Sequence, residues 1–134
     1  MKYIIKMSGR LLVFDKVNAN GHLFSKDCEI ITPKTVPVLQ NFERNSLGAV
    51  IGSANITKDE KGLACDVKLT NFDPDILHTE FKDQLYIGGL YSQIKSHKEN
   101  DITVIDSAVL RFVGTTLYPA DDECKMIINE KMYL

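Results

Sequence analysis

The sequence has 134 residues, of which 44% are hydrophobic and 25% are charged. This length suits one packed domain and is short for two, so we treat residues 1–134 as a single domain. Sixteen Lys and Arg residues against 18 Asp and Glu residues leave a formal net charge of -2. That balance gives no reason to expect a nucleic acid or an anionic membrane as a partner.

The cysteines and the N-terminal run indicate a soluble intracellular protein. Cys28, Cys65 and Cys124 are odd in number, far apart and without Cys-x-x-Cys spacing, which argues against a disulfide framework and a zinc site. We expect them to act as small apolar residues. The charges within residues 1–10 are wrong for a signal peptide, and no run approaches the roughly 18 apolar residues of a membrane span.

The first part of the chain has the patterning of β-strands. Residues 2–14 are rich in apolar and β-branched side chains, and an Asn-Gly turn follows within residues 18–21. Residues 35–40 predict a short strand. Pro33 and Pro37 favour an edge position for it, or a segment that only leads into a strand.

A β-hairpin is predicted next, from residues 47–57 and 63–70 with the polar turn 58–62 between them. In its second strand, apolar residues alternate with mainly polar ones, which is the period of two of a half-buried strand. The alternating apolar residues are Leu63, Cys65, Val67 and Leu69.

One helix is predicted over residues 73–85. Asp73 can cap the free backbone N–H groups, and Pro74 suits the first helical position because its missing N–H has no helical partner there. An apolar stripe follows at helical spacing, made of Leu77, Phe81 and Leu85 with Ile76 beside it.

After this helix, Gly88-Gly89 breaks the pattern and strands resume. The elements predicted there are a strand at 90–96, a turn at 97–101, one long or bulged strand at 102–117 that ends before 119–122, and a last short strand at 125–134. Six or more strands with one mid-chain helix make a mainly β, α+β chain. Because strand edges must be paired or covered, we expect an antiparallel β-barrel, closed or partly open.

The histidines do not have the spacing of a catalytic or metal site. His22, His78 and His97 lack ligand-type spacing with one another or with a pair of carboxylates, so we interpret each as a surface or capping residue. Ser92 and His97 are five residues apart and would face opposite ways on one extended strand. They therefore cannot pair as nucleophile and base without a bend.

Two further motifs have simple structural interpretations. Asp121-Asp122-Glu123 is interpreted as a solvated loop, because a hard cation needs ligands that converge from several positions. Gly88-Gly89 lacks the downstream helix and Lys of a phosphate loop, so we expect it to let backbones pass closely or to bend the strand. The sequence thus predicts no catalytic residue, no cofactor and no metal, and its interleaved charges do not favour a nucleic-acid surface.

Segments spread over nearly the whole chain resemble, in the right order, the motifs of phage prohead proteases. Those motifs are an early N-x-N-G-R-x-Y turn, a V-P-V-L-x-x-H strand, a hairpin with i-G-x-v and k-G-L, a G-L-S after a helix, and a late L-x-E-V-S … P-A segment. The matching segments here are NANGHLF (18–24), VPVLQNF (36–42), LGAVIG (47–52), KGL (61–63), GLYS (89–92), LRFV (110–113) and YPAD (118–121).

The resemblance implies a herpesvirus-assemblin-like β-barrel and a role in assembling a tailed-phage capsid. Enzymes of that family cut scaffold and capsid precursors with a serine that a histidine activates and a third residue orients. In this chain the histidine position falls on Phe42, the serine position on Tyr91 and the late acidic position on Phe112. Phenylalanine cannot accept a proton, and a phenol with a pKa of about 10 is a poor substitute for serine.

The sequence therefore favours a non-catalytic structural protein of the capsid, such as a head decoration, cement or other head-associated subunit. The expected partners are the major capsid protein or other phage head proteins, and the expected location is the virion after synthesis in the host cytoplasm. Homo-oligomerisation is left open. The short tail after residue 124 favours a finished subunit over a protease that cuts its own extension.

Two alternatives stay open at this stage. One is an active serine protease of prohead maturation, in which a shifted alignment pairs Ser92 with His22 or His78. The other is a β-barrel adaptor with no link to phages.

Overall fold

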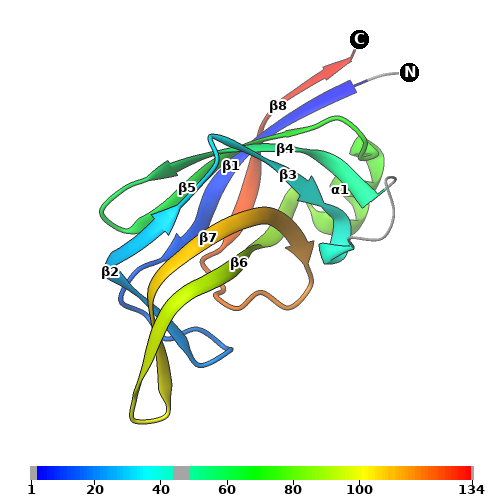
Figure 1. Cartoon of the computed structure of the whole chain (residues 1–134). Coiled ribbons are helices and arrows are strands. Elements are labelled where there is room, and N and C mark those ends of the chain that lie inside the picture. The colour runs from blue at the N-terminus through cyan, green and yellow to red at the C-terminus, as the bar shows by residue number, and fades with distance from the viewer. Residues whose placement is uncertain (1–2, 44–48, 134) are drawn as a thin grey trace.

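The computed structural model describes residues 3–43 and 49–133 (Figure 1). Over these residues the chain forms mainly β-strands with one α-helix, as the sequence predicts. The elements are β1 (Tyr3–Val13), β2 (His22–Ile31), β3 (Thr35–Leu39), the short 3-10 helix η1 (Gln40–Phe42), β4 (Val50–Lys58), β5 (Gly62–Leu69), α1 (Pro74–Phe81), β6 (Gln84–Glu99), β7 (Ile102–Thr116) and β8 (Lys125–Tyr133).

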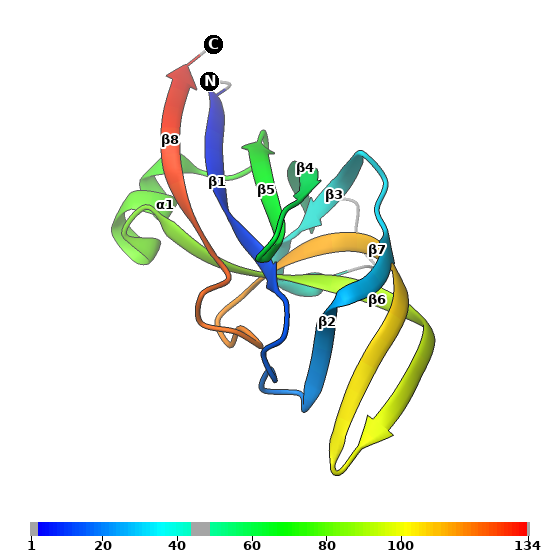
Figure 2. The same ribbon diagram turned by 90° about the vertical axis from the view of Figure 1, so that its left-hand side faces the viewer.

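All of these strands belong to one sheet, in the order β2-β7-β3-β4-β5-β1-β8-β6, and a further pairing joins β6 back to β7. Hydrogen bonds therefore run in a ring through every strand except β2, which lies outside the ring against β7. The ends of β1 and β8 lie side by side, and the hairpin of β6 and β7 projects away from the ring (Figures 1 and 2). One cluster of buried apolar side chains takes members from every strand and from α1.

The expectation of an antiparallel sheet is wrong in part. β7 pairs in parallel with β2 and also with β3, whereas the pairs that are close in sequence are antiparallel. Adjacent strands joined by a tight turn must run antiparallel, but long connections allow either direction. β2 and β3 are far from β7 in sequence, so no turn fixes their direction.

The hairpin of β4 and β5 confirms the prediction made from the period of two. Leu63, Cys65, Val67 and Leu69 are all buried, while Asp66 and Lys68 between them are exposed. Asp59 closes the turn by accepting hydrogen bonds from the N–H groups of Lys61 and Gly62 at 2.9 and 3.0 Å. The first two residues predicted for this hairpin, 47 and 48, lie outside the described residues, as do residues 2 and 134 of the predicted outer strands.

β2 and β3 differ from the sequence prediction. β2 was not predicted, because only Phe24 and Cys28 of its ten residues are buried and its register shifts between Phe24 and Glu29. β3 is not an edge strand, since it pairs with both β4 and β7. It tolerates Pro37 because its pairing with β7 begins only at Val38, beyond the residue that has no N–H to donate.

The helix begins as predicted and ends earlier. Asp73 accepts a hydrogen bond from the Asp75 N–H at 2.8 Å, which caps α1. Lys82 and Asp83 then adopt left-handed conformations with φ of 54° and 62°, and the Asp83 N–H returns to the Leu77 carbonyl. The predicted stripe to Leu85 is therefore wrong at its end, because Leu85 is a buried residue of β6.

The strand after α1 begins at Gln84, earlier than the predicted 90–96, so Gly88-Gly89 does not stand before that strand as predicted. Both residues lie inside β6, where they pair with Gly114 and Val113 of β7. The predicted turn at 97–101 is also too long, since β6 continues to Glu99 and the chain reverses at Asn100 and Asp101. None of the described helices is long and apolar enough to cross a membrane.

Candidate functional site

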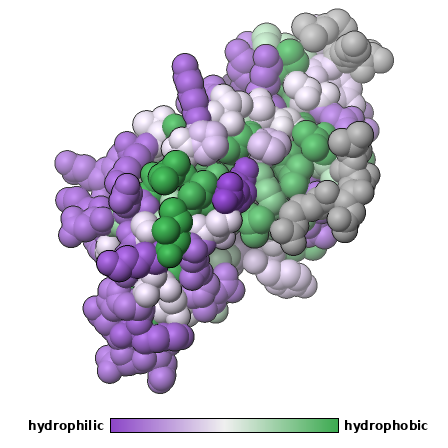
Figure 3. All heavy atoms as spheres, viewed as in Figure 1, coloured by the Kyte–Doolittle hydropathy of each residue, from purple (hydrophilic) through white to green (hydrophobic). Residues whose placement is uncertain are grey.

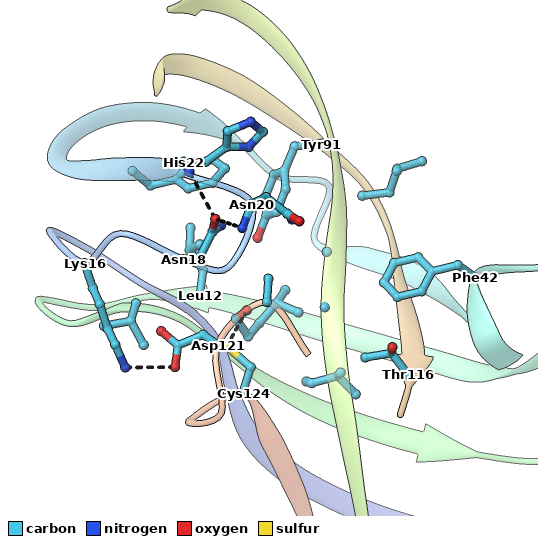
Figure 4. Close-up of a pocket in the computed structure, with 18 of the residues that line it drawn as sticks. Leu12, Lys16, Asn18, Asn20, His22, Phe42, Tyr91, Thr116, Asp121 and Cys124 are labelled. Carbon is cyan, nitrogen blue, oxygen red and sulfur yellow. Dashed lines mark hydrogen bonds and ion pairs between the residues drawn. The ribbon is translucent and has the colours of Figure 1, made fainter. Parts of the chain in front are cut away.

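The three motif positions lie close to one another on β6, β7 and η1 but on two faces of the sheet. The rings of Phe42 and Phe112 pack together, with centroids 6.0 Å apart. Tyr91 packs instead on Phe24, with centroids 4.9 Å apart. In Figure 4, Phe42 and Tyr91 lie on opposite sides of the β6 ribbon. Phe42 and Phe112 therefore pack on each other, while Tyr91 has a different ring partner.

Phe42 reaches its position through the tight turn of η1. Asn41 and Phe42 both have left-handed conformations, with φ of 51° and 56°, and the Asn41 N–H donates to Oγ1 of Thr115 at 2.8 Å. This turn lays the Phe42 ring across β6 and β7. A Cβ built on Gly114 would lie 2.5 Å from the ring, and one built on Gly88 would lie 3.2 Å from it. The paired glycines thus give the ring its space.

Tyr91 turns its hydroxyl back along β6. A Cβ built on Gly89 would lie 2.7 Å from both Cζ and Oη of Tyr91, so this glycine gives space to the end of the phenol. The hydroxyl oxygen exposes less than 1 Å² and has no hydrogen-bond partner among the described residues. Burial raises the pKa of Tyr91, with smaller contributions from the nearby thiols of Cys124, Cys65 and Cys28. The group therefore stays a neutral hydroxyl.

Ser92 is not joined to a histidine by any hydrogen bond within residues 3–43 and 49–133. Its Oγ accepts a hydrogen bond from Nε of Arg111 at 2.9 Å. His78 lies on α1 and pairs with Asp83 at 3.0 Å, while the backbone N–H of His22 donates to Oδ1 of Asn18 at 3.1 Å. No hydrogen bond among the described residues therefore joins the ring of His22 or of His78 to Ser92, and His78 is paired with Asp83 instead.

His97 lies between two carboxylates on the projecting hairpin. Its Nδ1 is 2.7 Å from Oδ2 of Asp106, and its Nε2 is 3.0 Å from Oε1 of Glu99. The hydrogen bond with Asp106, followed by that with Glu99, raises the pKa of His97 above its ordinary value of 6.5. No group of three His, Cys, Asp or Glu residues suited to a metal ion occurs in the described part of the chain.

The acidic run forms an ion-pair cluster with the loop after β1. Nζ of Lys16 lies 3.0, 3.8 and 4.0 Å from the carboxylates of Asp121, Asp122 and Glu123. The Ala19 N–H donates to the Ala120 carbonyl at 2.8 Å, so backbone also joins the two loops. Asp121, with 8% of its side chain exposed, therefore connects the two loops, whereas Asp122 and Glu123 are exposed to solvent as predicted.

All three cysteines are free and buried, as small apolar residues would be. Burial raises the pKa of Cys65 and of Cys124 to about 12 in each case. The Cys124 thiol donates to the Leu11 carbonyl at 3.1 Å. These thiols are thus held protonated inside the core.

A pocket of about 350 Å³ opens where β6 leaves β8. β6 pairs with β8 only from Gln84 to Tyr86, and the Ile87 N–H then bonds the Cys124 carbonyl. Beyond that point the pocket separates β6 from the end of β1 and from the two joined loops (Figure 4). Its apolar lining includes Leu11, Leu12, Phe24, Phe42 and Ile87, and its polar lining includes Asn18, Asn20, His22 and Tyr91. Phe42 reaches this lining from the side of β6 opposite Tyr91 (Figure 4).

Sequence reasoning did not find this pocket. Its signals were present as separate features, namely the Asn-Gly turn, the glycine pair and the acidic run. No local pattern connects these features in the sequence, because only the ring of strands brings β1, β6 and the loop before β8 together.

Comparison with known proteins identifies no relative of this chain. No family model matches the chain, and neither the curated proteins nor the solved structures contain a match.

Proposed function

We propose that the protein is a non-catalytic structural component of a tailed-phage capsid, built on a barrel like that of the prohead proteases. Its place is the virion, as a head decoration, cement or other head-associated subunit made in the host cytoplasm. A mainly β chain whose sheet closes into a ring of hydrogen bonds, with one helix before β6, is compatible with that proposal.

The observation that carries the proposal is the packing at the three motif positions. Phe42 and Phe112 are in ring contact, and Phe42 covers the glycines of β6 and β7. Tyr91 is held neutral by burial. A serine protease needs a base within hydrogen-bond reach of its nucleophile, and no such pair occupies these positions. Aromatic rings there serve packing instead of proton transfer.

The outer edge of β2 beyond Phe24 is the proposed contact with the capsid. β2 pairs with β7 on one side, and on the other side the loop after β1 bonds to His22, Leu23 and Phe24. No strand among the described residues pairs with that side of β2 from residue 25 to residue 31. Such an edge can accept a strand of a neighbouring protein. Ile31 at the end of β2 is 51% exposed, so it offers an apolar contact beside that edge.

Binding to shells tests this proposal. The purified protein is mixed with shells of the major capsid protein encoded in the same genome, and the mixture is sedimented. We expect the protein to sediment with the shells and to leave capsid and scaffold precursors uncut. Ile31→Lys should weaken binding, whereas Ile127→Lys on β8, where the native residue is 55% exposed, should not. Failure of the wild-type protein to bind these shells would contradict the proposal. A genome that encodes no portal, scaffold or capsid protein would also contradict it and would favour an unrelated adaptor.

A serine-directed fluorophosphonate separates this function from an active protease. Only an activated serine reacts with such a probe. We expect no labelling of Ser92, because among the described residues no histidine is hydrogen-bonded to its Oγ, which accepts from Arg111 and has no base to take its proton. Labelling and precursor cleavage that both disappear in Ser92→Ala would establish the protease alternative.

A further inference from the structure

The pocket beside β6 combines an apolar interior with one buried polar group that no described residue satisfies. That group is the Tyr91 hydroxyl, which exposes less than 1 Å². A buried hydroxyl without a hydrogen bond costs free energy, so native proteins usually supply a partner. We propose that the pocket binds a compact, neutral and largely apolar molecule that accepts a hydrogen bond from the Tyr91 hydroxyl.

The size and lining of the pocket fit such a molecule. A volume of about 350 Å³ lies at the lower end of the roughly 300–1,000 Å³ of small-molecule sites. Leu12 and Phe24 provide apolar contacts, and the ring of Phe24 packs on Tyr91 and so fixes the direction of the phenol. One side of the ligand therefore meets carbon atoms. The Tyr91 hydroxyl is covered in the ligand-free protein, so the ligand's oxygen reaches it only when the side chains around it move aside.

The charges at the rim favour a neutral ligand over an anion. Lys16 is the cationic side chain that lines the pocket, and it is already paired with Asp121 at 3.0 Å. Asp122 and Glu123 lie within 4.0 Å of the same amine. An incoming carboxylate or phosphate would have to compete with three acids for one amine.

The joined loops favour a compact ligand over an extended peptide. The loop after β1 and the loop before β8 are connected by the Ala19–Ala120 hydrogen bond and by the Lys16–Asp121 ion pair. Both loops line the pocket, so together they form a wall on one side of it (Figure 4). A chain running through the pocket would have to displace these contacts, whereas a small molecule would not.

Two matched probes test the proposal by NMR titration of the backbone amides. Acetophenone supplies an aromatic ring and a carbonyl acceptor, and ethylbenzene has a similar shape without the oxygen. We expect acetophenone to produce saturable shifts grouped at Leu12, Gly88, Gly89 and Tyr91. Tyr91→Phe removes only the hydroxyl and should weaken acetophenone binding about fivefold, the value of one ordinary hydrogen bond, while leaving the affinity for ethylbenzene unchanged.

Two control variants keep the result interpretable. Tyr118→Phe removes a hydroxyl at the same rim from a residue that is 89% exposed, so it should not alter either affinity. Ala120→Leu places a larger side chain in the lining and should reduce binding of both probes. The inference does not depend on the proposed function, because capsid binding and probe binding are measured separately.

The inference would be overturned by the lack of grouped shifts with acetophenone, by equal acetophenone affinity in the wild type and Tyr91→Phe, or by unchanged binding in Ala120→Leu. Shifts caused by N-acetylphenylalanine methylamide but not by acetophenone would also overturn it, and would assign the pocket to a peptide side chain.

Discussion

The two halves of β6 show how one strand can lie in two environments. From Gln84 to Ser92 every residue is buried or partly buried, whereas from Gln93 to Glu99 every residue is exposed. Both halves pair with β7. The first half also meets β8 and the Phe42 ring, while the second projects as the hydrophilic arm at the lower left of Figure 3.

The two halves of β6 are therefore held in place by different kinds of interaction. In the first half, side chains are positioned by close packing, and Gly88, Gly89 and Gly114 are needed for space. In the second half, cross-strand polar pairs such as His97–Asp106 supply the specific contacts. The stability of the packed half therefore depends on side-chain volume. The exposed polar pairs of the second half depend on pH and contribute little to stability.

The largest expected difference in stability comes from truncating two apolar residues, one paired with the first half of β6 and one within its second half. Leu110 is fully buried opposite Tyr91, and Ile94 is 60% exposed. Leu110→Ala should lower the free energy of unfolding by about 2–5 kcal/mol, since it leaves a cavity. Ile94→Ala should change it by no more than about 0.5 kcal/mol. Urea denaturation of both variants measures the contrast, and equal losses would contradict it.

A smaller effect is expected from filling the space of a glycine. In Gly114→Ala, the new Cβ would lie 2.5 Å from the Phe42 ring, and overpacking of this kind costs about 1–3 kcal/mol. The loss should be much smaller when measured in a Phe42→Ala background, because the clashing ring is then gone. A double-mutant cycle by thermal or urea unfolding tests this, and a loss that is the same in both backgrounds would place the strain elsewhere.

Removing the Tyr91 hydroxyl should stabilise the ligand-free protein. Tyr91→Phe keeps the ring contact with Phe24 and removes a buried group that has no partner among the described residues. We expect the free energy of unfolding to rise by about 1 kcal/mol. Tyr118→Phe is the control, since that side chain is exposed. A loss of stability in Tyr91→Phe would show that the hydroxyl has a stabilising partner.

The smallest effect is the pH response of the projecting arm. The hydrogen bond with Asp106, and then that with Glu99, raises the pKa of His97 above 6.5, so the folded protein favours the protonated ring. Its contribution to stability is therefore complete below pH 6.5 and is lost as the pH rises through the raised value.

NMR titration of the His97 ring protons checks this directly. Asp106→Asn should lower the pKa more than Glu99→Gln does, because Asp106 is the larger cause. In His97→Gln, the stability difference from the wild type should fade with rising pH. A His97 pKa at or below 6.5 would contradict the assignment.

Local signals in the sequence were sufficient for several elements. Alternation predicted the β4–β5 hairpin, and Asp73 with Pro74 predicted where α1 begins. The Asn-Gly turn is confirmed, since Asn18 accepts hydrogen bonds from the N–H groups of Asn20 and His22 and Gly21 has a φ of 73°. Each of these features depends on neighbours within a few residues.

The predictions that failed depended on distant residues. Leu85 has helical spacing from Leu77 and Phe81, yet it is buried in β6, where it pairs with Met126 of the distant strand β8. A glycine pair such as Gly88-Gly89 usually marks the end of a regular element. Here both glycines lie inside β6, where their missing side chains leave space for the rings of Phe42 and Tyr91.

The sequence by itself determined that the chain is mainly β with one mid-chain helix, because alternation, capping and turn residues act over short distances. Only the tertiary structure decided that β2 and β3 run parallel to β7, that Tyr91 packs on Phe24 while Phe42 packs on Phe112, and that a pocket opens beside β6. Those features arise when strands far apart in sequence close into a ring, and no local pattern encodes which side chains then meet.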